Sequence, residues 1–166
     1  MNLFVIGVGA SGGQALGLVD AGIAALGEPD PVRVVGRSRR YQNPAWGGAT
    51  RAPFVNAAVV VDTTLPASSL LALLFAIEGA QGRVRSARKN QARTLDLDLL
   101  WQVAPAGPSS SSSPLLPHPR LLERSFALVP AVEALRSAGL AVPLELAAAA
   151  RRHALAPLFA LPLHAG

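Results

Sequence analysis

The feature that most constrains the fold is a short run in which aspartate and leucine alternate, TLDLDLL at residues 94–100. Alternate side chains of a β-strand point to opposite faces, so the leucines are expected in the core and Asp96 and Asp98 together on the other face. With a rise of about 3.3 Å per residue, their Cα atoms would lie about 7 Å apart. Aspartate is unfavourable in strands, and two on one face therefore indicate a function.

Asp96 and Asp98 are predicted metal ligands. Mg²⁺ prefers carboxylate and phosphate oxygens, and paired metal sites hold ions about 3.5–4 Å apart. The alternative is a strand face that only meets water. The residues just before the carboxylates favour the metal, because residues 83–93 form a basic run without apolar periodicity. Guanidinium groups bind phosphate oxygens bidentately, and metal with arginine is typical of phosphoryl-type transfer. Such a run could also close over a substrate.

The rest of the chain predicts a single domain, residues 1–166, of the α+β class. Strands and helices interleave, but their connections are too varied for a repeated βαβ array, so helices packed on a small sheet are expected. A Pro-Gly-poly-Ser segment at about 104–114 is expected to be a flexible surface insert. Strands are expected at 3–8, 32–40, 54–64 and 94–101, with a break at 41–44, and helices at 14–26, from 66 to 79 or 82, 121–135 with a possible kink at Pro130, and 144–155.

Composition excludes several classes of protein. A hydrophobic fraction of 51% against 15% charged residues supplies a core and excludes global disorder. The chain has no cysteine, which excludes disulfides and thiolate sites. No apolar run approaches the about 20 residues needed to cross a bilayer, and the start lacks a basic signal-peptide region, so a cytoplasmic protein is expected. The net charge of +5 indicates either an anionic partner or merely an arginine-rich surface.

A glycine motif near the start offers a different hypothesis. GVGASG at residues 7–12 satisfies the G-x-G-x-x-G pattern of dinucleotide-binding turns, and Arg37 and Arg39 could meet a 2′-phosphate. A nucleotide-binding protein that uses the loop from Gly7 to Gly12 would need further βα units, which the residues after Tyr41 do not supply. A tight turn between a strand and a helix is therefore the favoured interpretation.

Four sequence blocks, in order, resemble those of the 6-hydroxymethyl-7,8-dihydropterin pyrophosphokinase family. They are FVNAA (54–58), EGAQGRVR (78–85), RTLDLD (93–98) and the segment from PHPR to ERSF (117–126). The resemblance spans roughly residues 32–134 and implies a ferredoxin-like α/β sandwich with a small antiparallel sheet. It also implies Mg²⁺-dependent transfer of pyrophosphate from ATP to 6-hydroxymethyl-7,8-dihydropterin, giving AMP and the pterin diphosphate for folate biosynthesis.

The resemblance further implies a role for each matching residue. Asp96 and Asp98 would hold two Mg²⁺ ions, and Arg83 and Arg93 would stabilise charge on the transferred group. The predicted ATP contacts are Glu78, Arg85, His118 and Arg124. The predicted pterin contacts are Phe54 and Phe126 stacking on the ring, Asn56 at its edge, and Trp46 as added aromatic cover. Phe54 and Phe126 could instead be core residues, and His118 a surface histidine.

The sequence also departs from the family pattern. The first turn lacks an asparagine, residues 90–92 replace a Trp-Gly-Pro-like stretch, and a serine run precedes His118. A divergent paralogue acting on another pterin, or an inactive one, is therefore the alternative. We expect ATP and a pterin alcohol as partners, no membrane, a monomer, and a product passed to a dihydropteroate synthase. Nucleic acid is not expected, because residues 83–93 contain no aromatic side chain to stack on bases.

Overall fold

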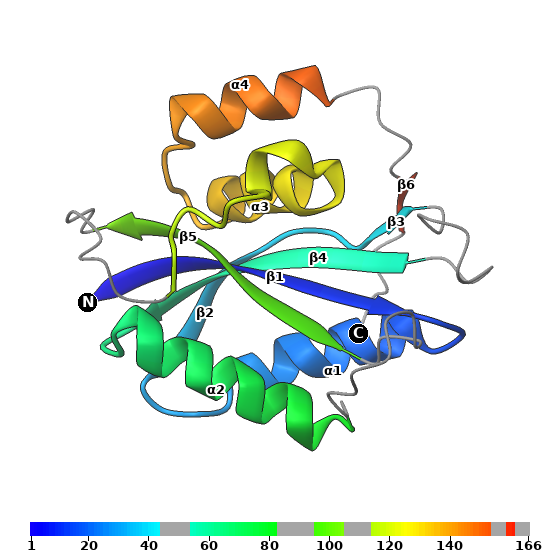
Figure 1. The fold of residues 1–166 in the computed structure, drawn as a ribbon, viewed down its shortest axis with the longest axis vertical. Helices are drawn as coiled ribbons and strands as arrows, with labels where there is room; N and C mark the ends of the chain where they lie inside the picture. The colour runs from blue at the N-terminus through cyan, green and yellow to red at the C-terminus, as the bar shows by residue number, and fades with distance from the viewer. Residues whose placement is uncertain (44–53, 83–94, 105–113, 154–158, 162–166) are drawn as a thin grey trace.

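The protein is seen here in a computed structural model, which describes residues 1–43, 54–82, 95–104, 114–153 and 159–161 (Figure 1). Some predictions fall outside these residues. They are the roles of Trp46, Arg83, Arg85 and Arg93, and most of the Ser/Pro insert, residues 105–113.

An antiparallel sheet of six strands forms the centre of the fold. Its strand order is β5-β1-β4-β3-β6, and β2 also pairs with β4. The strands are β1 (Asn2–Ser11), β2 (Val32–Arg37), β3 (Tyr41–Asn43), β4 (Phe54–Thr63), β5 (Asp96–Ala104) and β6 (Phe159–Ala160).

Helices cover both faces of this sheet. Figure 1 shows α1 and α2 on one side and α3 and α4 on the other. The chain order β1-α1-β2-β4-α2-β5, with β5, β1, β4 and β2 as neighbours, is the ferredoxin-like arrangement, so the expected α+β sandwich is confirmed. The helices are α1 (Ala15–Leu26), α2 (Ala67–Ala80), α3 (Ser125–Ser137) and α4 (Leu144–Arg152), with a 3₁₀ helix at Leu121–Glu123. None of the described helices is long and apolar enough to cross a bilayer.

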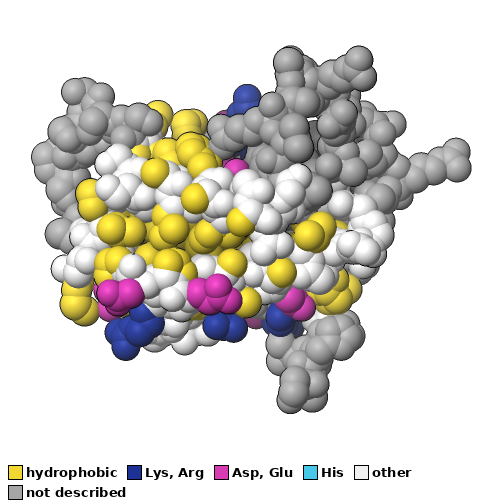
Figure 2. Space-filling view, turned by 90° about the horizontal axis from the view of Figure 1, so that it is seen from below, with side chains coloured by type: hydrophobic (Ala, Val, Ile, Leu, Met, Phe, Trp, Pro, Cys, Tyr) yellow, Lys and Arg dark blue, Asp and Glu magenta, His cyan; other side chains and the backbone are white. Residues whose placement is uncertain are grey.

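The larger core lies between the sheet and the α1/α2 layer. The predicted inward leucines, Leu95, Leu97 and Leu99, are buried there beside alternate residues of β1 and β4. Leu70 and Leu74 of α2 and Val19 of α1 face them. Outside this layer, Figure 2 shows hydrophobic side chains over much of the outward surface and charged side chains along one edge.

Two local predictions about strands were wrong. The first strand extends to Ser11, because it pairs with β4 along its whole length. The expected break after residue 40 is instead β3, which pairs with β4 and β6. Pro130 lies inside α3 without ending it. A proline costs a helical hydrogen bond, but here buried neighbours such as Leu128 and Ala131 pack α3 onto the sheet.

Candidate active site

Strand register brings the predicted metal and substrate residues together in two rows across β4, β1 and β5. In the first row, Gly9 of β1 pairs with Asn56 of β4 on one side and with Asp96 of β5 on the other. Gly7 pairs with Ala58 and with Asp98 in the next row. Paired residues share a face of the sheet, so Asn56 and both carboxylates lie on the face opposite the buried leucines. The shared face predicted for Asp96 and Asp98 is confirmed.

This face, which is turned toward α3, divides into two halves. In one half Val5, Val60 and Trp101 form a second apolar core with α3 and α4. In the other half the same strands present Gly9, Asn56 and Asp96 instead of apolar side chains. Asp96 and Asp98 are partly exposed, whereas Asn56 is buried. The polar half is therefore the part of the face that a ligand could reach.

The glycines of β1 make room for neighbouring side chains on this face. A Cβ atom at Gly7 would lie 3.1 Å from Cδ1 of Leu100, and one at Gly9 would lie 2.9 Å from Oδ1 of Asn56. Leu100 lies where the register between β1 and β5 shifts, two residues after Asp98. Bulges of this kind are frequent next to active sites, where they redirect side chains.

The dinucleotide-binding hypothesis for GVGASG is wrong. Gly7 and Gly9 lie within a strand of an antiparallel sheet, not in a turn that presents a helix N-terminus to a phosphate. The simpler interpretation as a turn was also wrong for Gly9, whereas Gly7 lies within the strand expected at 3–8. Gly12, with φ of 106°, does lie in the turn before α1. Long-range pairing with β4 and β5 decided this geometry, which the motif alone could not show.

Two asparagines meet at the β4 end of the row that contains Gly9. Nδ2 of Asn56 donates a hydrogen bond to Oδ1 of Asn43 over 2.6 Å, and both residues are buried. Phe54 begins β4 opposite Asn43 and Ser11, and it is half-buried. Alternation along β4 places Phe54 on the same face as Asn56. Sequence reasoning missed Asn43, because it lay at the edge of a Gly/Pro-rich segment that was assigned to a break.

Glu78 lies on the opposite side of β5, within the α2 packing. Its side chain is 1% exposed, and Oε1 accepts a hydrogen bond from the backbone N–H of Leu97 over 2.7 Å. Leu97 lies between the two aspartates, and β5 is at the end of the strand order. The carboxylate therefore satisfies a backbone donor of an edge strand at the predicted metal site. The predicted contact of Glu78 with ATP stays a prediction.

The remaining predicted residues lie near the start of α3. The backbone N–H of His118 donates to the carbonyl of Leu100 over 2.8 Å, which holds this segment against β5. The His118 Nδ1 atom accepts a hydrogen bond from the Arg120 N–H over 3.2 Å. Arg124 directly precedes α3, and its Cζ lies 5.7 Å from the ring centre of Phe126, a cation–π distance. Their roles toward ATP and pterin stay predictions.

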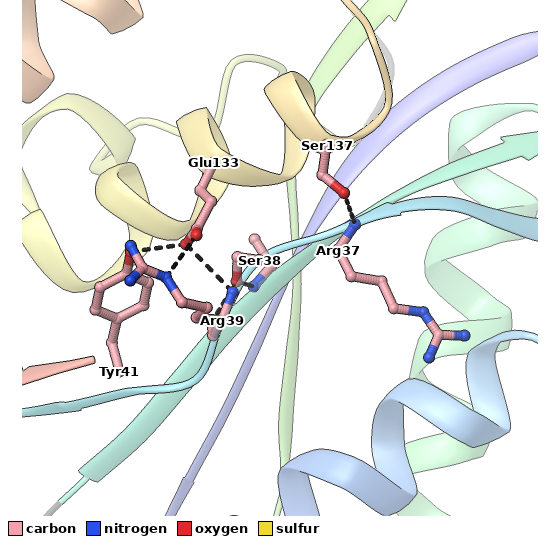
Figure 3. A network of polar contacts seen from close by, with 7 residues as sticks. Arg37, Ser38, Arg39, Tyr41, Glu133 and Ser137 are labelled. Atoms are coloured by element: carbon pink, nitrogen blue, oxygen red, sulfur yellow. Dashed lines mark hydrogen bonds and ion pairs between the residues drawn. The ribbon is translucent and has the colours of Figure 1, made fainter. Parts of the chain in front are cut away.

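A polar network ties β3 to α3 (Figure 3). Glu133 of α3 accepts hydrogen bonds from Nε of Arg39 over 2.7 Å and from the hydroxyl of Tyr41 over 2.6 Å. Burial raises the pKa of Tyr41, and the hydrogen bond to Glu133 raises it further. The same carboxylate, through its hydrogen bond and its charge, raises the pKa of Arg39. Glu133 lies 92 residues from Tyr41, so no local pattern could have indicated the contact.

The donor set of the site fits Mg²⁺. Among the described residues no group of three or more histidine, cysteine, aspartate or glutamate side chains could hold a metal. A pair of carboxylates on one face is nevertheless the usual protein share of a magnesium site whose other ligands are water and substrate phosphates. Asp96 and Asp98 form such a pair. Both are partly exposed, and they pair with Gly9 and Gly7 of β1.

Comparisons with known proteins point to one protein family. The model of the 7,8-dihydro-6-hydroxymethylpterin-pyrophosphokinase family matches residues 5–136. A Methylorubrum extorquens protein named 2-amino-4-hydroxy-6-hydroxymethyldihydropteridine pyrophosphokinase is 37% identical over 134 residues, which cover 80% of this chain and 82% of that protein. A Bacillus subtilis protein of the same name is 33% identical over 132 residues, covering 80% of this chain and 77% of that protein.

Proposed function

The chain belongs to the 7,8-dihydro-6-hydroxymethylpterin-pyrophosphokinase family, and we propose that it transfers pyrophosphate from ATP to 6-hydroxymethyl-7,8-dihydropterin. The products would be AMP and the pterin diphosphate used in folate biosynthesis. The observation that carries the proposal is the register that sets Asn56 and Asp96 on either side of Gly9, with Asp98 in the next row. The amide that we propose binds the substrate and the carboxylates that we propose bind the metal thereby lie on the same half of one sheet face.

Asp96 and Asp98 would hold the metal, with two Mg²⁺ ions as the expected number. When bound, Mg²⁺ neutralises phosphate charge and aligns the attacking hydroxyl with the transferred group. The chain itself contributes a rigid platform. Glu78 holds the Leu97 N–H between the two carboxylates, and the apolar core beneath Leu97 and Leu99 fixes the strand. Arg83 and Arg93, outside the described residues, would stabilise negative charge on the transferred group.

The pterin would lie at the Asn56 end of the rows. Phe54 is on the same face of β4, and Phe126 comes from the helix layer that covers this face. Aromatic faces suit a flat heterocycle, and an amide offers both a donor and an acceptor to its edge. Two of the four predicted ATP contacts, Arg124 and His118, lie toward the start of α3 and beside Leu100 of β5.

The biological setting follows from the same proposal. The product would pass to a dihydropteroate synthase, and the protein would act as a monomer in the cytoplasm. Size-exclusion chromatography with light scattering would test the monomer, and a dimer would contradict it.

The decisive experiment measures AMP formed from ATP and Mg²⁺ with and without 6-hydroxymethyl-7,8-dihydropterin. We expect AMP only when the pterin is present, and its loss in Asp98→Ala. Glu28→Gln is the control, because Glu28 is exposed in the turn after α1. A folded wild-type protein that forms AMP only with a different pterin alcohol would reject this substrate and support the divergent paralogue. A folded protein that forms no AMP with any pterin would reject the activity.

A further inference from the structure

Asn43 holds the side-chain amide of Asn56, and the missing side chain of Gly9 leaves room for it. On one side, Nδ2 donates to Oδ1 of Asn43 over 2.6 Å. On the other side, Oδ1 lies so close to Gly9 that any Cβ atom there would approach it to 2.9 Å. The amide nitrogen is therefore directed toward β3 and the amide oxygen toward β1. Both asparagines are at least nine-tenths buried, with exposed fractions of 9% for Asn56 and 7% for Asn43.

The strand that carries Asn43 is itself anchored from three directions. Tyr41 pairs with Asn56 in the sheet, and its hydroxyl donates to Glu133 of α3 over 2.6 Å. β6 pairs with the outer edge of β3, and the Leu161 N–H donates to the carbonyl of Arg40 over 2.8 Å. A short strand of three residues would otherwise be easily displaced. With these contacts, Asn43 is a fixed acceptor for the Asn56 amide.

We propose, resting on the proposed function, that Asn43 and Gly9 are positioning residues that decide which hydrogen-bonding edge of the pterin is accepted. One of the two N–H groups of Nδ2 is bonded to Asn43, which keeps the nitrogen on the β3 side, and the Asn56 oxygen is the group that lies beside Gly9. A heterocycle seated over Gly9 must then present an N–H donor to that oxygen. A ring with an acceptor at the same place would bring its own lone pair against that of the Asn56 oxygen, and the repulsion would exclude it.

The orientation also links the two halves of the reaction. Asp96 pairs with Gly9 from the side opposite Asn56. Two strand spacings of about 4.8 Å separate the Cα atoms of Asn56 and Asp96. A ring held by the Asn56 oxygen would thus be aligned along the row that leads to the metal pair. Misorientation of the amide should weaken pterin binding without changing the ATP site.

A matched set of variants tests the role of Asn43. Asn43→Leu keeps the approximate volume but removes the acceptor, and Asn43→Asp retains an oxygen in its place. We expect Asn43→Leu to raise KM for the pterin about tenfold, the loss of one buried hydrogen bond, with KM for ATP and kcat nearly unchanged. Asn43→Asp should restore most of the loss. Asn2→Leu is the control, since it removes a comparable hydrogen bond to the Leu65 carbonyl at the other end of the sheet.

Gly9 gives a second and independent test. Gly9→Ala would push the Asn56 oxygen away, and we expect the same rise in KM for the pterin. Gly17→Ala in α1, where nothing lies within 4 Å of an added Cβ, should leave KM unchanged. Thermal unfolding of each variant shows whether it is folded. A normal pterin KM in folded Asn43→Leu or in folded Gly9→Ala would overturn the inference.

An NMR measurement separates this inference from the proposed function. In ¹⁵N-labelled protein without ligand, the Asn56 side-chain NH₂ signals should shift and exchange faster with water in Asn43→Leu than in Asn2→Leu. Unchanged Asn56 signals would overturn the orientation even in an active enzyme. Shifted signals in a protein that does not use the pterin would confirm the orientation, reject the proposed function, and overturn the assigned role in pterin selection.

Discussion

On the side facing α1 and α2, the central strands carry an unbroken set of buried apolar side chains, whereas half of the opposite side carries glycine, amide and carboxylate groups. The two faces use alternate residues of the same strands, so Leu97 and Asp98 are chain neighbours with opposite tasks. The continuous apolar face supplies most of the stability, so part of the opposite face can carry polar groups for binding. Substitutions at adjacent positions should therefore separate stability from activity.

The largest effect is expected on the polar face. Asp98→Asn removes a metal-binding charge while keeping the shape of the side chain, and kcat/KM should fall by about 10²–10³-fold. Its free energy of unfolding should change by no more than about 1 kcal/mol, because the side chain is partly exposed. Steady-state AMP formation and urea unfolding measure the two quantities. Full activity in Asp98→Asn would contradict the proposed functional role of the polar face.

The reciprocal substitution is on the apolar face, one residue earlier. Leu97→Ala should lower the free energy of unfolding by about 2–5 kcal/mol, because it leaves a cavity beneath β5 where Leu97 is only 2% exposed. Urea unfolding measures the loss, and AMP formation at low temperature should remain within a few-fold of wild type. If Leu97→Ala instead kept its stability and lost its activity, the proposed division of tasks would be wrong.

Where α3 covers the sheet, the free energy of unfolding should be sensitive to added side-chain volume. A Cβ atom at Gly36 would lie 2.5 Å from the carbonyl oxygen of Ala134 and 2.6 Å from Cβ of Ala138. Gly36→Ala should therefore push α3 away from β2 and cost about 1–3 kcal/mol. Gly17→Ala, in open space on α1, should instead be neutral or stabilising by up to about 1 kcal/mol. Equal stabilities for these two variants, measured by thermal unfolding, would contradict the close contact.

The smallest effect concerns the contact between Glu133 and Tyr41. The pKa of Tyr41 is raised above 10.0 by burial and by its hydrogen bond to Glu133, so the folded state favours the neutral phenol. This contribution to stability is fully present below pH 10 and is lost as the pH rises through the folded-state pKa. The chain has a single tyrosine, so its ultraviolet titration reports Tyr41 alone. Glu133→Gln should lower that pKa, and an unchanged titration would argue against the contact.

Much of the fold and part of the site could be predicted from local pattern. Alternation in TLDLDLL was sufficient to place Leu97 inward and Asp96 and Asp98 together, and helical periodicity found α1 and α2 to within a residue or two. Local pattern failed where pairing decided the conformation. Tyr41–Asn43 became a strand because β4 and β6 flank it, and Gly9 became a strand residue because β4 and β5 pair with β1 beyond the expected end at Val8.

The amino-acid sequence by itself determined which side chains share a face and which segments are amphipathic, because these properties follow from backbone periods of two and 3.6 residues. The tertiary structure alone decided that Asn56, Gly9 and Asp96 form one row, that Glu78 binds the Leu97 N–H, and that Asn43 holds the Asn56 amide. Register depends on burying both faces of the sheet at once. That condition involves residues far apart in the chain, so no local window of sequence contains it.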